Sequence, residues 1–354
     1  MLSLLLILRN YWTLIANLRR HPQKSVVLTY LLLVATSGIV LFSGINIDVT
    51  NNSNLAQAQA QEQQQGGVEK TSINILWETP NDLNNPESVV YAPKQNVLFV
   101  SNIDGKPDQK DQNGFISKVS PSNGSIVELN WITGLNAPKG MAIYNNNSSS
   151  RLYVSDITDL VEIDIGSGKI IKRFNAPGSA FLNDVALDDH GNIYVSDTAT
   201  NTIYKLDASA KDSNNTSLKA WLQSPQLNGP NGLHFDNSKN RLIIASLGEM
   251  SKPGAGIEFV DLKNKNISSL GKEGTTSPFG GLDGIESDTT GKRYYVTDNP
   301  AGKIYSVNSD GAEYITLIDL HTQGAADLGF IPNQSAIIIP LMQENKLVAY
   351  KLVE

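Results

Sequence analysis

Apolar and polar residues alternate in short runs along the chain from residue 71 onward, and clusters of turn-forming residues separate the runs. One pattern occurs six times: a polar residue, a small or apolar residue, an apolar alternation, and then a turn. The six copies begin at Glu87, Lys139, Asn183, Asn231, Asp283 and Asp327. Their starts lie 44 to 52 residues apart, which is the length of one four-stranded propeller blade. We therefore predict an all-β, six-bladed propeller over residues 71–354.

The first five copies contain enough strand-forming runs for four strands each, and the sixth supplies only three. Residues 73–78, ahead of the first copy, form a further unassigned run of β-rich sequence. We expect this run to become the outer strand of the last blade and to close the ring. Closure removes an open sheet edge, which would otherwise pair with other chains. Residues 71–354 are then a single domain.

The N-terminal part of the chain has a different character. Between Lys24 and Asp48 lie 23 uncharged, mostly apolar residues, long enough as a helix to cross the roughly 30 Å hydrocarbon core of a membrane. Basic residues precede this run, so the positive-inside rule places residues 1–24 in the cytoplasm and the propeller outside it. We expect residues 25–47 to be a transmembrane anchor or a cleaved signal segment. Either one exports the propeller, leaving it membrane-anchored or secreted.

Residues 48–70 are rich in Gln, Asn and Ala and have little to bury, so we interpret them as a low-complexity linker. The chain carries 35 acidic and 28 basic residues, a net charge of −7. This balance argues against a nucleic-acid partner, which needs clustered Lys and Arg. Cysteine is absent and only four His occur, so a thiolate zinc site is excluded and a multi-histidine metal site is not expected.

The first strand of a propeller blade is the innermost one, so the six repeat-starting polar residues should form a ring in the central channel. Their formal charges sum to −2, a charge that a divalent cation would neutralise. Carboxylate and amide oxygens favour hard cations, and a roomy ring favours calcium over magnesium. The sequence therefore predicts a calcium site in the channel, with a solvated or salt-bridged channel as the alternative.

Four repeat motifs carry a resemblance to a known family. They are Pro86-Glu87-Ser88-Val89, Leu182-Asn183-Asp184, Pro230-Asn231-Gly232-Leu233 and Leu282-Asp283-Gly284. With them, roughly residues 80–354 resemble the gluconolactonase, senescence-marker-protein and luciferin-regenerating-enzyme family of calcium-dependent propellers. The resemblance implies hydrolysis of a small lactone or related ester. In such enzymes the cation polarises the substrate carbonyl and lowers the pKa of a bound water.

The resemblance also implies roles for individual residues. Glu87, Asn231 and Asp283 match the direct metal ligands. Asn183 matches a residue that lines the metal site and holds substrate or a metal-bound water, and Asp283 is the carboxylate best suited to orient that water or take its proton. Asp184 is a weaker candidate for a supporting role.

Two departures from the family pattern concern the substrate. Members that act on sugar lactones carry an Arg two residues before the Asn of the third blade, and this chain has Phe181 there. Lys139 places a cation in the ring, where Asp327 or Glu87 would have to pair with it. We expect Asn183, Phe181, Lys139 and Asp327 to face the substrate. The alternatives are a non-catalytic propeller that binds a protein, glycan or small ligand, and a strictosidine-synthase-like enzyme.

Overall fold

The computed structural model describes residues 27–29, 44–46 and 73–352, apart from 147–148, 212–216, 249–253, 271–276 and 311–312. The chain divides into two compact units, Met1–Lys70 and Thr71–Glu354. In the first unit, β1 (Val27–Thr29) pairs antiparallel with β2 (Gly44–Asn46). Most of the expected anchor over residues 25–47 lies outside the described residues. Within the described part of the chain, no helix has the length and apolar character needed to span a membrane.

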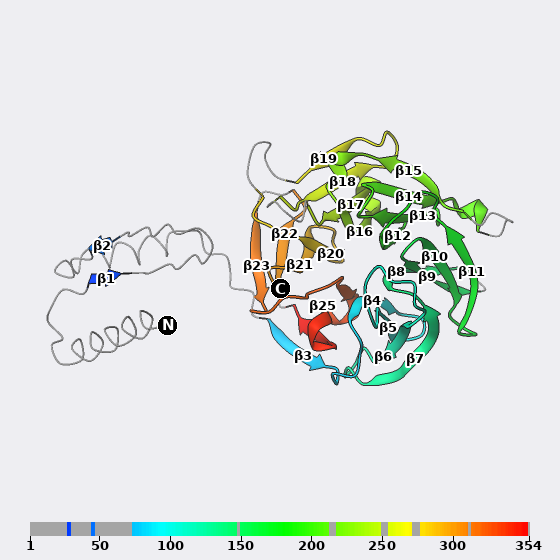
Figure 1. Ribbon diagram of the computed structural model, residues 1–354, viewed down its shortest axis with the longest axis horizontal. Helices are drawn as coiled ribbons and strands as arrows, with labels where there is room; N and C mark the ends of the chain where they lie inside the picture. The colour runs from blue at the N-terminus through cyan, green and yellow to red at the C-terminus, as the bar shows by residue number, and fades with distance from the viewer. Residues whose placement is uncertain are drawn as a thin grey trace, which may run out of the picture. The chain divides into compact units, whose positions relative to one another are not determined.

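The second unit is a six-bladed β-propeller, with six four-stranded antiparallel sheets arranged in a ring around a common centre (Figure 1). The innermost strands are β4 (Pro86–Ala92), β8 (Pro138–Asn145), β12 (Leu182–Leu187), β16 (Pro230–Asp236), β20 (Leu282–Ser287) and β24 (Gly329–Ile331). The second strands are β5 (Val97–Asn102), β9 (Ser150–Asp156), β13 (Ile193–Asp197), β17 (Arg241–Ser246), β21 (Arg293–Asp298) and β25 (Ala336–Leu341). The architecture predicted from the repeats is confirmed.

The outer half of each blade follows the same order. The third strands are β6 (Gly114–Val119), β10 (Asp159–Asp164), β14 (Thr202–Leu206), β18 (Ile257–Asp261), β22 (Lys303–Asn308) and β26 (Lys346–Lys351). The outer strands are β7 (Ile126–Leu135), β11 (Lys169–Asn175), β15 (Lys219–Gln223), β19 (Ile267–Ser269), β23 (Tyr314–Asp319) and β3 (Asn74–Glu78). Five short 3-10 helices lie in described connections: η1 (Ala208–Ala210), η2 (Pro225–Leu227), η3 (Asn237–Lys239), η4 (Pro332–Gln334) and η5 (Met342–Glu344).

The last blade combines both ends of the propeller sequence. Strand β3 pairs antiparallel with β26, from Asn74 opposite Lys351 to Glu78 opposite Val348. Trp77 of β3 is buried in an apolar cluster that also contains Leu98 and Ile338. Burial of this large side chain joins the sixth blade to the first, since hydrophobic stabilisation scales with the apolar area removed from water.

Hydroxyl groups on three of the second strands tie a blade to the next one at the level of the channel ring. Ser196 Oγ donates to the backbone carbonyl of Asn231 at 2.7 Å, and Thr297 Oγ1 donates to that of Ala326 at 2.9 Å. Ser155 makes the same kind of bond to the carbonyl of Asn183. The buried backbone around the ring is therefore hydrogen-bonded between blades, as buried carbonyl groups require.

Candidate functional site

A β-bulge at the first polar residue of the inner strand aims side chains into the channel. Pairing between β12 and β13 skips from Leu182 to Val185, so Asn183 and Asp184 lie in the unpaired step. The same shift occurs in β4, β8, β16 and β20 at their own ring residues. A bulge bends its strand and re-aims a side chain. Five of the six ring residues are positioned in this way.

Glycines next to the ring residues allow the inner strands to touch. A Cβ atom on Gly284 would lie 2.5 Å from the backbone nitrogen of Leu328 in the next blade, and one on Gly140 would overlap Asp184. Gly232 has the same relation to Asp283. The ring residues of neighbouring blades are therefore held close together around the channel.

Asp327 is the ring residue whose placement differs from the expectation. It precedes the sixth inner strand, which begins at Gly329, and forms an isolated parallel bridge with Ser88 of the first blade. Its carboxyl group accepts a 2.6 Å hydrogen bond from Ser88 Oγ, and its amide donates to the carbonyl of Glu87 at 2.9 Å. The residue thus joins the last blade to the first at the ring.

Glu87, Asn231 and Asp283, the three expected metal ligands, are all buried, with exposed fractions of 5%, 4% and 8%. Asn231 Nδ2 donates to Asp283 Oδ1 at 3.2 Å and to the carbonyl of Leu282 at 3.2 Å. Asn299 Nδ2 donates to the other carboxylate oxygen, Asp283 Oδ2, at 2.8 Å. The amide groups of both asparagines are thereby oriented with their nitrogen atoms toward Asp283.

Two oxygen atoms at this centre have no protein hydrogen-bond partner among the described residues. They are Glu87 Oε2 and Asn231 Oδ1, and both are buried. A buried acceptor without a partner costs about 1–3 kcal/mol, so native proteins rarely leave one without a reason. Both atoms belong to residues expected to bind a cation.

The electrostatics of the ring favour a positive ligand. Burial raises the pKa of Glu87 well above its usual value, and repulsion from Asp283 adds to the effect while Lys139 opposes it. Burial also raises the pKa of Asp283 to about 6, against the hydrogen bonds from Asn299 and Asn231. Burial raises the pKa of Asp327 as well, with Asp184 and Glu87 contributing. A cation would relieve this cost by stabilising the charged carboxylates.

The donor set is one of hard oxygen atoms. Among the described residues no group of three or more His, Cys, Asp or Glu side chains is arranged to hold a metal ion. The channel instead offers two carboxylates, from Glu87 and Asp283, together with the amide oxygen of Asn231. Carboxylate and amide oxygens are ligands that calcium accepts in flexible numbers, so the residues present fit that ion.

Asn183 and Phe181 lie beside this centre on the third blade. Asn183 Nδ2 donates to Thr198 Oγ1 at 3.3 Å, a bond that orients the amide group. The ring of Phe181 lies 4.4 Å from Lys139 Nζ, at the distance of a cation–π contact. Phe181 therefore contacts the lysine instead of offering the cationic group found in sugar-lactone enzymes.

Lys139 is buried, and its ammonium group bonds to backbone. Nζ donates to the carbonyl of Pro107 at 2.9 Å and to that of Ala137 at 3.0 Å. Within the described part of the chain these carbonyls, and not Asp327 or Glu87, are its hydrogen-bond acceptors. Burial lowers the pKa of Lys139, and the negative charge of Glu87 raises it in opposition. The bond to Pro107 attaches the long β5–β6 loop to the ring.

Asp184 links two blades. Its carboxylate accepts a 2.6 Å hydrogen bond from the amide of Leu233 in the fourth blade and another of 2.6 Å from the amide of Val185. Burial raises the pKa of Asp184 to about 7, although these two backbone bonds lower it. The residue contributes to the negative potential of the ring while it holds the blades in register.

Asn299 and Thr198 were not among the residues expected at the site. Each follows an aspartate that ends a second strand: Asp298 and Asp197. The carboxylates of these aspartates accept hydrogen bonds from backbone amides. Asp298, for example, accepts from the amides of Gly280 and Gly281 at 2.8 and 3.1 Å. The signal in the sequence was a polar residue directly after the second-strand aspartate, but only the folded blade shows that it reaches the ring.

Comparison with known proteins gives structural neighbours but no sequence family: no family model and no curated sequence matches the chain. A gluconolactonase from Xanthomonas campestris superposes with a TM-score of 0.58 at 15% identity, over 80% of this chain and 90% of that one. A catalytically inactive virginiamycin B lyase from Staphylococcus aureus, solved with quinupristin, gives 0.53 at 15% identity, over 80% and 99%. A streptogramin B lyase gives 0.54 at 12% identity, over 80% and 98%. These similarities establish the fold.

Proposed function

We propose that the protein is a calcium-dependent hydrolase of a small lactone or ester, with its site in the propeller channel. One observation carries the proposal. Glu87 Oε2 and Asn231 Oδ1 are buried acceptors without a protein partner, and they belong to the same buried cluster as Asp283. The structural similarity to a gluconolactonase is compatible with this activity, and the repeat motifs resemble the corresponding family.

Glu87, Asn231 and Asp283 would hold the cation, and Asn183 would complete the site or hold substrate. The bound cation would supply electrophilic polarisation of the substrate carbonyl. Asp283 is also the carboxylate suited to orient the attacking water or to accept its proton, because it lies in the channel beside Asn231. Asn299 fixes the orientation of that carboxylate through its 2.8 Å hydrogen bond.

The substrate would meet an unusual combination of groups. The Phe181 ring and the Lys139 ammonium group pack together, and two of the three ammonium donors are used by carbonyl oxygens. This face offers apolar surface and a single fixed positive charge, and lacks the Arg expected for a sugar lactone. We therefore infer a substrate with an apolar portion next to the carbonyl, and Asp327 would act on it only indirectly, through Ser88 and Glu87.

Calcium titration of the purified full-length chain by calorimetry tests the proposal. We expect one ion bound per chain, with binding lost in the Glu87→Gln/Asp283→Asn double variant and weaker binding of magnesium. A screen of aliphatic lactones and esters with and without chelator then tests the activity. Absence of calcium binding, or turnover that survives in the double variant, would show that this site is not the hydrolase centre.

A non-catalytic ligand-binding propeller is the second candidate. The observation in its favour is that Lys139 is tied to Pro107 and Ala137, which makes the rim of the channel a fixed surface. Calcium binding without turnover of any lactone or ester would favour this function, because a structural cation could hold such a surface in shape.

We further propose that residues 25–47 place the propeller outside the cytoplasm, as a membrane anchor or as a cleaved signal segment. The 23-residue uncharged run between Lys24 and Asp48 supports this. Membrane fractionation of a C-terminally tagged chain separates the two forms. An anchored protein stays in the membrane fraction at full size, a cleaved one is released at lower mass, and a cytosolic full-size protein would contradict both.

A further inference from the structure

A second group of polar side chains lies farther along the inner strands β16 and β20. His234 is three residues after Asn231, and Glu286 is three residues after Asp283. His234 Nδ1 lies 3.0 Å from Glu286 Oε2, and His234 Nε2 lies 2.9 Å from Ser287 Oγ. Three residues of strand span about 10 Å, so this group is separate from the ring.

The chemistry of the partners determines the tautomer of the imidazole ring. A carboxylate can only accept a hydrogen bond, so the proton of the neutral ring belongs on Nδ1, facing Glu286. The lone pair then lies on Nε2, where it can accept the hydroxyl hydrogen of Ser287. This is the order of contacts found in a nucleophile–base–acid triad: hydroxyl, imidazole, carboxylate.

The serine end of this group opens to a cavity. His234 and Ser287 line a cavity of about 400 Å³ at the ends of β16 and β20, together with Phe235 and Tyr294. Asn237 and Thr289 line the same cavity and carry donors of the kind that stabilise an oxyanion. The His234 side chain is 24% exposed, so a small molecule in the cavity can reach it.

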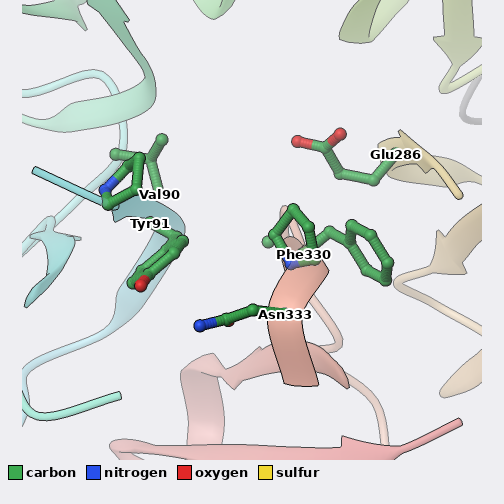
Figure 2. Close-up of a pocket in the computed structure, with 8 residues that line it drawn as sticks. Val90, Tyr91, Glu286, Phe330 and Asn333 are labelled. Carbon is green, nitrogen blue, oxygen red and sulfur yellow. The ribbon is translucent and has the colours of Figure 1, made fainter. Parts of the chain in front are cut away.

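The carboxylate end lines a different cavity. Glu286 borders a space of about 390 Å³ that is lined mainly by apolar side chains, including Val90, Tyr91 and Phe330. Figure 2 shows the Glu286 carboxyl group directed into this space, opposite Val90 and Tyr91. Glu286 therefore borders this space while its carboxylate contacts His234.

We propose that Ser287, His234 and Glu286 form a second reactive site, an acyl-transfer centre for small carboxylic esters. Ser287 Oγ adds to the ester carbonyl carbon while its proton moves to His234 Nε2. The carbon–oxygen bond to the alcohol breaks, and the alcohol leaves with that proton. Water then attacks the acyl-serine, delivers one proton to the leaving Ser287 oxygen through His234, and releases the acid. The net reaction is ester and water to acid and alcohol.

The charged groups around His234 set the direction of its pH dependence. Burial lowers the pKa of His234, but Glu286, Asp236 and Asp184 raise it, and the net effect is an increase. Arg241 Nε, 3.1 Å from Asp236 Oδ2, offsets part of the negative charge at that position. Only the neutral imidazole accepts the serine proton, so the reactivity of Ser287 increases as pH rises through the pKa of His234.

A fluorophosphonate probe tests the proposal on the full-length chain. The Ser287 oxygen would displace fluoride from phosphorus, and the adduct would appear by peptide mass mapping on the peptide that contains Ser287. Ser287→Ala should abolish this adduct, and His234→Gln should slow its formation by at least about 100-fold. Glu286→Gln should also slow it, and this variant decides the test if His234→Gln does not fold.

Two controls separate this site from its surroundings and from the channel. Ser238 lies in the same cavity, but its hydroxyl donates to Asp236 Oδ1 at 2.6 Å instead of meeting an imidazole, so Ser238→Ala should label as the wild type does. The wild-type chain in excess chelator should also label normally, because the proposed reaction uses no cation. No adduct on Ser287, or equal rates in wild type, His234→Gln and Glu286→Gln, would overturn the proposal and leave the group a structural contact between blades.

Discussion

Asp283→Asn should make the calcium-free propeller more stable while it removes stabilisation by calcium. Raising the pKa of Asp283 from 3.8 to about 6 costs the folded state about 3 kcal/mol at neutral pH. Asparagine is neutral and avoids this cost. The asparagine side chain has a single acceptor oxygen, so it can no longer accept hydrogen bonds from both Asn231 and Asn299. Loss of one of these bonds costs about 1 kcal/mol of stability. The net expected gain is about 2 kcal/mol, or about 3 °C in melting temperature for a domain of this size.

The sign of the effect depends on pH. Between the unfolded pKa of 3.8 and the folded pKa of about 6, the folded wild type binds more protons than the unfolded chain, so its stability falls as pH rises. The advantage of the asparagine variant should therefore be absent below about pH 4 and fully present above about pH 6. Urea unfolding at several pH values in the presence of chelator measures this difference.

Calcium reverses the ranking of the two proteins. At a free concentration of 100 times its dissociation constant, the ion should stabilise the wild type by about 2.7 kcal/mol, and the variant by far less. Asp298→Asn is a matched control in the same blade, since Asp298 caps Gly280 and Gly281 and makes no part of the proposed ligand set. Loss of these caps should destabilise the calcium-free and the calcium-bound protein, and because the Asp298 charge only adds to the raised pKa of Asp283, the calcium response should be largely retained. A chelated Asp283→Asn protein less stable than wild type, with its calcium response intact, would refute the reasoning.

Three further outcomes are expected. Glu258→Gln should stabilise the propeller increasingly from about pH 4.5 to 8. Burial raises the pKa of Glu258 to about 8, so the folded wild type loses stability as pH rises through this range. Urea unfolding midpoints of wild type and variant across the same range measure the difference. Gly284→Ala should destabilise by about 2 kcal/mol or more, since its Cβ would lie 2.5 Å from the Leu328 nitrogen. Gly166→Ala, with its nearest atom at 3.5 Å, should change the melting temperature little. Deletion of residues 74–78 removes β3, exposes an edge of β26 and should cause aggregation visible by light scattering.

The repeat pattern in the sequence was sufficient to predict most of the propeller. Each blade is built from local antiparallel hairpins, and their alternation and turns lie within about 50 residues. The same pattern singled out Glu87, Asn231 and Asp283 as ring residues. The pattern placed Lys139 in the ring as well, but it did not predict the hydrogen bonds from Lys139 to Pro107 and Ala137. The bond to Pro107 depends on a loop from a different blade, whose position the local sequence does not specify.

The sequence alone thus determined which residues stand at the ring, since the spacing of these residues follows from the period of the blades. What they contact was decided by the tertiary structure. Bulges turn Asn183 and its counterparts into the channel, and close packing of neighbouring strands leaves Glu87 Oε2 and Asn231 Oδ1 without protein partners. The pairing of His234 with Ser287 and Glu286 likewise spans two blades. Such contacts join residues about 50 positions apart, and only the packing of neighbouring blades brings them within hydrogen-bonding distance.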